Sequence, residues 1–176
     1  MGKASDINLK SVENSTRSFL YRQPMKFGGR VVEDVCVLRT EVAVTQVGGR
    51  KKTIGVGEMT VGNAWAWPSK IPSKVTQRLM TELANRLAAR AQDASLTGDP
   101  LQITHRIGKL RDAICSEMVS EYKITEPIPK LAAMVAASPL EAAIHDAFGR
   151  VHGRNSFDLM SAEFLNEDLS TYLNEE

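Results

Sequence analysis

Residues 32–47 read VEDVCVLRTEVAVTQV, and this stretch decides the fold class. Its apolar residues alternate between two faces and many are β-branched, a pattern typical of a long β-strand. The apolar residues of one predicted face are Val35, Val37 and Ala43, and those of the other are Cys36, Leu38, Val42 and Val44. Gly48 and Gly49 follow, and this dipeptide favours a tight hairpin turn.

Strands are predicted on both sides of this stretch. Residues 53–61, TIGVGEMTV, give the return strand, in which Gly55 and Gly57 indicate a bulge or a close approach of another backbone. Residues 8–22 are a further strand candidate before the hairpin. Three strands in succession predict an antiparallel meander.

From Pro68 onward the pattern becomes helical. Apolar residues recur at helical spacing in two stretches, Ile71, Val75, Leu79, Leu83 and Leu87, then Ile103, Ile107, Leu110, Ile114 and Met118. Asp99 is predicted to cap the second helix, which Pro100 opens. A short helix is expected over residues 129–135, and a capping box at residues 138–141 predicts the start of another.

Strands that precede helices in this way predict an α+β fold, a three-stranded antiparallel meander followed by a bundle of three to four helices. The 176 residues suit one domain, with the sheet in residues 1–67, the helices in 68–160 and an acidic tail in 161–176. The net charge of +1 gives no electrostatic case for nucleic acid or a membrane surface, so neither partner is expected. Two cysteines without metal-ligand spacing, and no apolar leader, indicate a cytoplasmic location.

The most suggestive chemical pair is His145 and Asp146. With His105 upstream and Asp168 downstream, it suggests an HD-type metal hydrolase, in which imidazole and carboxylate groups hold a divalent ion. The strand-rich first part does not belong in that all-helical fold, so a surface pair on a helix is favoured. No nucleophile motif accompanies the three histidines.

Two tryptophans flank Ala66 between the last predicted strand and the first helix. In an extended segment Trp65 and Trp67 would point to opposite sides, one into the core and one toward a ligand. The basic glycine turns at residues 26–30 and 48–52 are interpreted as loops between strands, because neither has the ending of a phosphate-binding loop. Glu58 fits either an inward functional group or the open face of a half-exposed sheet.

Four segments in this order resemble a known family. They are RQPMKFGG (22–29), VCVLRTEVAVT (35–45), GVGE (55–58) and SPLEAAIHDAFGRVHGRN (138–155). Together they resemble the N-terminal capping domain of the enolase superfamily, in the mandelate racemase and muconate-lactonizing enzyme branch. In the last segment the positions that match the family pattern are Asp146, Gly149, Arg150 and Gly153.

The resemblance implies where chemistry takes place in such an enzyme. Family members are lyases and isomerases that carry catalysis in a C-terminal β/α barrel, where carboxylates hold Mg²⁺ and a lysine or histidine acts as base. The sequence has no Lys-x-Lys motif and stops where the barrel is expected to begin, so no catalytic residue, metal ligand or cofactor is assigned to this chain alone. Mg²⁺ is expected only with a barrel, and whether the chain alone is an enzyme is left open.

In the family, two loops of the cap cover the barrel mouth and shape specificity. By position they assign the substrate-lid candidates, which are Met25, Lys26, Phe27, Gly28, Arg30, Trp65 and Trp67. The leading hypothesis is therefore a capping domain, present as a fragment or truncated form, of a sugar-acid dehydratase, racemase or cycloisomerase. Its expected partners are a barrel domain or a homologous subunit, in a homo-oligomer. The alternatives are a free-standing interaction or regulatory module and, last, the HD-type hydrolase.

Overall fold

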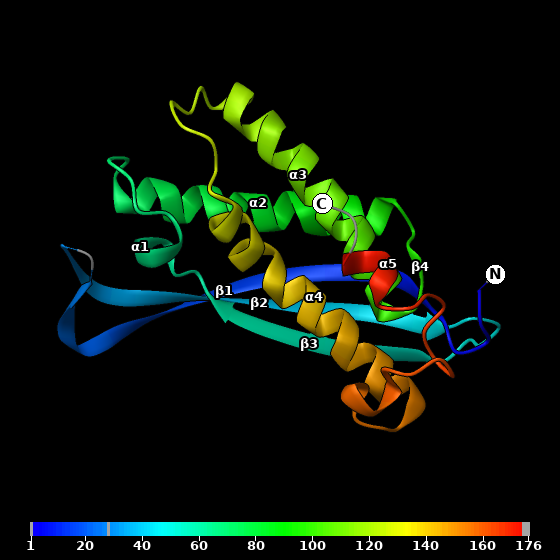
Figure 1. Ribbon diagram of the computed structural model, residues 1–176. Coiled ribbons are helices and arrows are strands. Elements are labelled where there is room, and N and C mark those ends of the chain that lie inside the picture. The colour runs from blue at the N-terminus through cyan, green and yellow to red at the C-terminus, as the bar shows by residue number, and fades with distance from the viewer. Residues whose placement is uncertain (1, 28, 174–176) are drawn as a thin grey trace.

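A twisted antiparallel sheet forms one layer of the structure, and helices cover one of its faces (Figure 1). The computed structural model describes residues 2–27 and 29–173. Three long strands form the predicted meander, β1 (Ile7–Phe27), β2 (Arg30–Gln46) and β3 (Lys52–Thr60). A short strand that the sequence did not reveal, β4 (Thr97–Gly98), pairs with the first two residues of β1 and gives the order β3-β2-β1-β4.

The helices follow the meander, so the predicted α+β class is confirmed. The three long helices are α2 (Ser73–Asp93), α3 (Pro100–Glu121) and α4 (Lys130–His152). The short ones are α1 (Asn63–Ala66), the 3₁₀ helix η1 (Ser156–Leu159) and α5 (Ser170–Leu173). No helix in the described part of the chain is both long and apolar enough to cross a membrane.

The predicted helical stripes are largely buried. The Asp99 cap is confirmed, because its Oδ1 accepts a hydrogen bond from the Gln102 N–H (3.0 Å). The exception is Val75, which is 44% exposed, while Thr76 and Met80 take the buried positions. A strict four-residue spacing drifts away from the 3.6-residue helical repeat, so the prediction failed at the first turn.

The predicted break near residue 138 does not occur. Helix α4 runs without interruption through Pro139, and its N-cap is Pro129. An interior proline forfeits one helical hydrogen bond at a cost of about 3 kcal/mol. Val135, Leu140 and Ile144 are buried on both sides of it, and their burial offsets that cost.

The two faces of β2 differ as the alternation predicts. Cys36, Leu38, Val42 and Val44 are all buried beneath the helices. The opposite, open face carries an ion-pair cluster, in which Arg39 bonds Glu41 (2.7 Å) and Glu58 (2.8 Å). Glu58 therefore lies on the open face. Ala43 shares that face but is only 4% exposed, which the alternation did not foresee.

Helix α4 lies unusually close to β3. A Cβ on Gly55 would lie 2.1 Å from the Ala143 carbonyl oxygen, and one on Gly57 would lie 2.1 Å from that of Pro139. The predicted close backbone approach is thus confirmed. Asp146 adds a polar contact at the same place, since its Oδ2 accepts a hydrogen bond from the Val56 N–H (2.8 Å). That oxygen also lies 2.8 Å from Arg150 Nε.

The acidic tail folds back onto the domain as far as residue 173, and residues 174–176 lie outside the described part. Phe164 is buried, and the Asn166 amide donates to Asp6 Oδ1 (2.8 Å) and Asp99 Oδ2 (3.1 Å). Both aspartates are almost completely buried. The tail therefore joins the start of β1 to the start of α3.

We expect Gly57→Ala to lower the free energy of unfolding by about 1–3 kcal/mol, because the new Cβ overlaps the α4 backbone. Urea denaturation measures the loss. Gly108→Ala is the matched control, since a Cβ there meets nothing closer than 3.8 Å and alanine favours a helix interior. Equal stability of the two variants would contradict the close contact.

Asn166→Asp should loosen the tail, because it sets a third carboxylate against Asp6 and Asp99 and removes the amide donor. A loss of about 1–3 kcal/mol is expected, with faster chymotrypsin cleavage near Phe164. Asn155→Asp is the control, because its side chain accepts a hydrogen bond from the Phe157 N–H and aspartate serves equally well as a cap. Unchanged cleavage of Asn166→Asp would argue against the tail contact.

Candidate functional site

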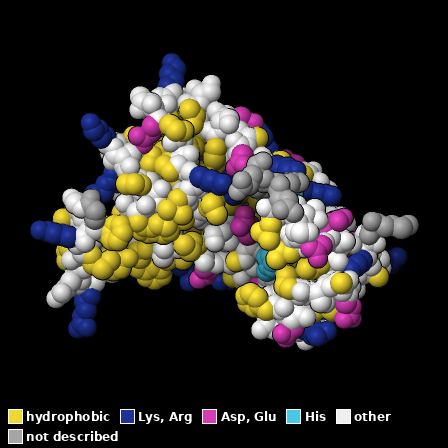
Figure 2. Space-filling model, in the orientation of Figure 1, with side chains coloured by type: hydrophobic (Ala, Val, Ile, Leu, Met, Phe, Trp, Pro, Cys, Tyr) yellow, Lys and Arg dark blue, Asp and Glu magenta, His cyan; other side chains and the backbone are white. Residues whose placement is uncertain are grey.

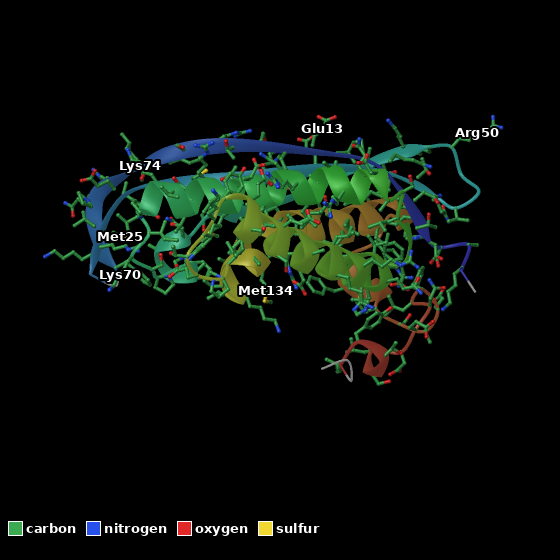
Figure 3. All side chains as sticks on the ribbon, turned by 90° about the horizontal axis from the view of Figure 1, so that it is seen from above. Glu13, Met25, Arg50, Lys70, Lys74 and Met134 are labelled. Atoms are coloured by element: carbon green, nitrogen blue, oxygen red, sulfur yellow. The ribbon has the colours of Figure 1, made fainter. Side chains whose placement is uncertain are left out.

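A groove of about 830 Å³ opens between the distal β1–β2 hairpin and the segment around α1. We call it the hairpin groove and define it by six of its lining residues, Met25, Phe27, Arg30, Val31, Trp65 and Ile71. The two segments are more than thirty positions apart in the sequence. Figure 3 shows Met25 of the hairpin and Lys70 of the other segment at the same end of the molecule.

The groove exists because the hairpin bends. Leu20 pairs with Asp34 and Met25 pairs with Val32, so β1 holds more residues than β2 across this interval. The extra residues include Pro24, which cannot donate to the ladder. Such an irregularity bends a strand, and the end of the ribbon turns toward the side of α1 (Figure 1).

Arg30 ties the tip of the hairpin to the opposite wall. Its Nη2 donates a hydrogen bond to the Ser69 carbonyl oxygen. Its Nη1 is buried and has no hydrogen-bond partner within residues 2–27 and 29–173. The guanidinium therefore links the two walls of the groove, and one of its nitrogens forms no hydrogen bond within the described residues.

The two tryptophans lie on opposite sides, as predicted, but the reason is helical and not extended backbone. Trp65 belongs to α1, and in an extended segment residues two apart would share one face. Trp65 is 38% exposed in the groove wall and packs over Gly62, where a Cβ would lie 2.1 Å from the indole Nε1. Trp67 is completely buried and donates from Nε1 to Glu126 Oε1 (2.8 Å). The structure thus brings Trp65 to the groove and leaves Trp67 in the core.

The remaining lid candidates divide in the same way. Met25, Phe27 and Arg30 line the groove, whereas Lys26 lies on the exposed strand and does not line it. Gly28 lies outside the described residues. Sequence reasoning missed Lys70 and Ile71, which line the groove from the loop after Trp67. Their position shortly after the two tryptophans in the sequence could have indicated that they belong to the same groove.

The residues considered for an HD-type site have separate structural partners. Asp146 binds β3 and Arg150 as described above, and Asp168 accepts a hydrogen bond from the Ser170 N–H (2.9 Å). The His105 ring packs against the Tyr172 ring, tilted by 59° with the centroids 5.5 Å apart. Within the described ranges, no group of three or more His, Cys, Asp or Glu side chains is arranged to hold a metal ion. The structure therefore does not bring His105, Asp146 and Asp168 together as one site.

Burial shifts the pKa values of His145 and of the two cysteines. It lowers the pKa of His145, and the negative charge of Asp99 opposes that shift. It raises the pKa of Cys36, and it raises that of Cys115 to about 11. Both thiols are therefore protonated at neutral pH, as expected for structural cysteines.

Comparison with known proteins finds similarity among solved structures. No protein-family model matches the sequence, and no curated protein matches it. Among solved structures, an enolase from Bradyrhizobium, complexed with magnesium and mandelic acid, is similar to this chain. The alignment covers 84% of this chain and 32% of that chain, with a TM-score of 0.46 and 14% sequence identity. This chain thus spans about a third of the length of that enolase.

We expect the stability of the protein to fall as the pH falls below about 6.5, the ordinary pKa of histidine. Because the pKa of His145 is lower in the folded state, the unfolded chain binds the proton more tightly. Glu141, whose pKa is raised by burial, acts in the opposite direction. His145→Gln should therefore lose less stability than the parent chain between about pH 7.5 and pH 5, measured by urea denaturation. An identical pH dependence would contradict this prediction.

Proposed function

We propose that this chain is the capping domain of an enzyme of the mandelate racemase and muconate-lactonizing enzyme branch of the enolase superfamily. The observation that carries the proposal is the hairpin groove. The two segments that the sequence resemblance assigns to the substrate lid, residues 25–30 and the segment around Trp65, meet around it. Four of the seven lid candidates line it together.

The other motifs of the resemblance have roles in building this cap. Gly55 and Gly57 of GVGE admit α4 to the sheet, and Asp146 bonds the strand between them. A Cβ on Gly149 would lie 2.8 Å from the Arg154 carbonyl oxygen. Gly153 ends α4 in the left-handed region with a φ of 63°. These motif residues therefore serve the fold, and none of them is assigned a step of catalysis.

The role proposed for this chain is to cover a substrate. Trp65, Met25 and Phe27 supply an apolar wall that excludes water. Removal of a proton α to a carboxylate, as in a sugar-acid dehydratase, racemase or cycloisomerase, belongs in this proposal to the barrel. Mg²⁺ is likewise assigned to the barrel, where the sequence resemblance places the carboxylates that hold it.

An exposed apolar patch is evidence that a partner docks on this domain. Figure 2 shows hydrophobic side chains gathered over α1 and the first turns of α4. Trp65, Leu131 (48% exposed) and Met134 (47% exposed) belong to these two elements. Large exposed apolar patches mark interaction surfaces. We propose that a barrel domain or a homologous subunit covers this patch, in a cytoplasmic homo-oligomer.

The same patch favours the second candidate function, an interaction or regulatory module that retains the cap fold. In that case the subunit on the patch would not be a catalytic barrel. The two functions differ in whether the assembly catalyses proton exchange. The patch is common to both, so its disruption does not distinguish them.

The purified chain alone, with Mg²⁺, should not exchange the α-proton of mandelate or gluconate with D₂O. Proton NMR measures the exchange. The tagged full chain, recovered from its own cells, should carry a barrel subunit and catalyse exchange with it. Exchange by the chain alone, or an assembly without a barrel, would overturn the proposal.

In that assembly, Trp65→Ala should raise KM about tenfold with little change in kcat, because it removes a wall of the groove and no reacting group. Phe157→Ala is the matched control, since Phe157 is 83% exposed on η1, outside the groove. A KM that both substitutions leave unchanged would contradict the lid role of Trp65.

A further inference from the structure

The outer edge of β1 is open over much of its length. The short strand β4 pairs only with Ile7 and Asn8. Side chains of α2 and β1 cover the next part, where Gln92 Oε1 accepts from the Val12 N–H (3.1 Å) and Asn14 Nδ2 donates to the Ala84 carbonyl oxygen (3.1 Å). Beyond Asn14 no element pairs with this edge in the part of the chain that the structure describes.

The register shows which backbone groups face outward. The Val12 N–H bonds Gln92, so it points away from β2. Pairing with β2 is regular from Val12 to Leu20, and the direction of the N–H and C=O groups alternates along an antiparallel strand. Thr16, Ser18 and Leu20 therefore present their N–H and C=O groups to the open edge. All three residues are exposed, and Leu20 is 85% exposed.

Basic side chains border this edge. A groove of about 340 Å³ runs beside it, and Thr16, Ser18, Lys74 and Arg78 are among the residues that line it. Figure 3 shows Lys74 at the end of α2 beside β1. Glu82 also lines the groove and is paired with Arg86 at 2.8 Å, a guanidinium that it shares with Glu121.

The nearby cations are not neutralised. No ion pair joins Lys74, Arg78 or Arg17 of β1 to a carboxylate within the two described ranges. Open main-chain groups and unpaired positive charge thus lie side by side. This combination suits a strand that carries negative charge.

We propose that the open edge of β1, from Thr16 to Leu20, binds an extended acidic peptide segment of a partner protein by β-strand addition. Main-chain hydrogen bonds to Thr16, Ser18 and Leu20 would extend the sheet. Carboxylates of the peptide would pair with Lys74 and Arg78 on the helix side of the sheet. This surface adjoins the hairpin groove, because Lys74 lines both, whereas Thr16, Ser18 and Arg78 do not line that groove.

The positive charge beside the edge also favours an acidic peptide over a second copy of the chain as the strand that binds there. Two copies that met edge to edge would be related by a two-fold axis near Ser18. That axis would set Arg17, Lys74 and Arg78 close to their own counterparts, and like charges repel. An acidic strand meets no such repulsion.

The probe is an eight-residue peptide of alternating valine and glutamate, blocked at both ends, titrated into the full chain by calorimetry. We expect binding that weakens as salt is added. The peptide with lysine in place of glutamate should not bind. The Lys74→Gln/Arg78→Gln double variant should bind the acidic peptide at least tenfold more weakly. Lys51→Gln/Lys52→Gln, with the same charge change at the β2–β3 turn, should bind it as the parent chain does.

Ser18→Pro tests the main-chain contact, because it removes an N–H that β2 does not use. Circular dichroism should show an intact fold, and peptide binding should be lost. If Ser18→Pro unfolds the protein, the comparison of the two double charge variants still tests whether the acidic peptide binds at this edge. The proposal would be overturned if both peptides bound equally well or if neither bound. It would also be overturned if the Lys74→Gln/Arg78→Gln and Lys51→Gln/Lys52→Gln variants lost the same amount of affinity for the acidic peptide. A parent dimer that Ser18→Pro converts to a monomer would assign the edge to a second copy and overturn it as well.

Discussion

The backbone contact between α4 and β3 determines how the helical layer sits on the sheet. Without side chains at Gly55 and Gly57, the helix backbone approaches the strand to a distance that no Cβ would permit. At that distance the Asp146 carboxylate bonds the Val56 N–H, which would otherwise face outward on an edge strand. One contact therefore sets the depth of the helix and also occupies a main-chain donor of the β3 edge.

The position of one wall of the hairpin groove also depends on the helical layer, although the groove lies away from the contact between α4 and β3. Trp67 is buried in the core next to this layer and bonds Glu126, in the chain leading into α4, so the start of the helix fixes the segment that presents Trp65. The other wall is a two-stranded ribbon that extends beyond the helices, and such ribbons are weak on their own. Arg30 joins the two walls through Ser69. The rigid wall comes from the core, and the adaptable wall comes from the ribbon.

Sequence reasoning succeeded where one local rule acted alone. The alternation of β2 predicted its buried face, and the Asp99–Pro100 pair predicted the start of α3. It failed at Pro139, where burial outweighs a local rule, and at β4, where two residues carry no periodic signal. Of the candidate site, the two segments were predicted, but the bend that joins them was not. That bend comes from unequal numbers of residues on paired strands, which no single-strand pattern reveals.

The bend in β1 also acts as a mechanical joint. Between Leu20 and Met25 the ladder is out of register, so the two ends of the ribbon are coupled by fewer hydrogen bonds than a regular hairpin would have. Beyond this joint, the Arg30–Ser69 bond links the tip to the body. Met25 and Phe27 both lie beyond the joint, so a rotation there would move them together as one wall. A change in the width of the groove at this joint would therefore disturb few main-chain hydrogen bonds.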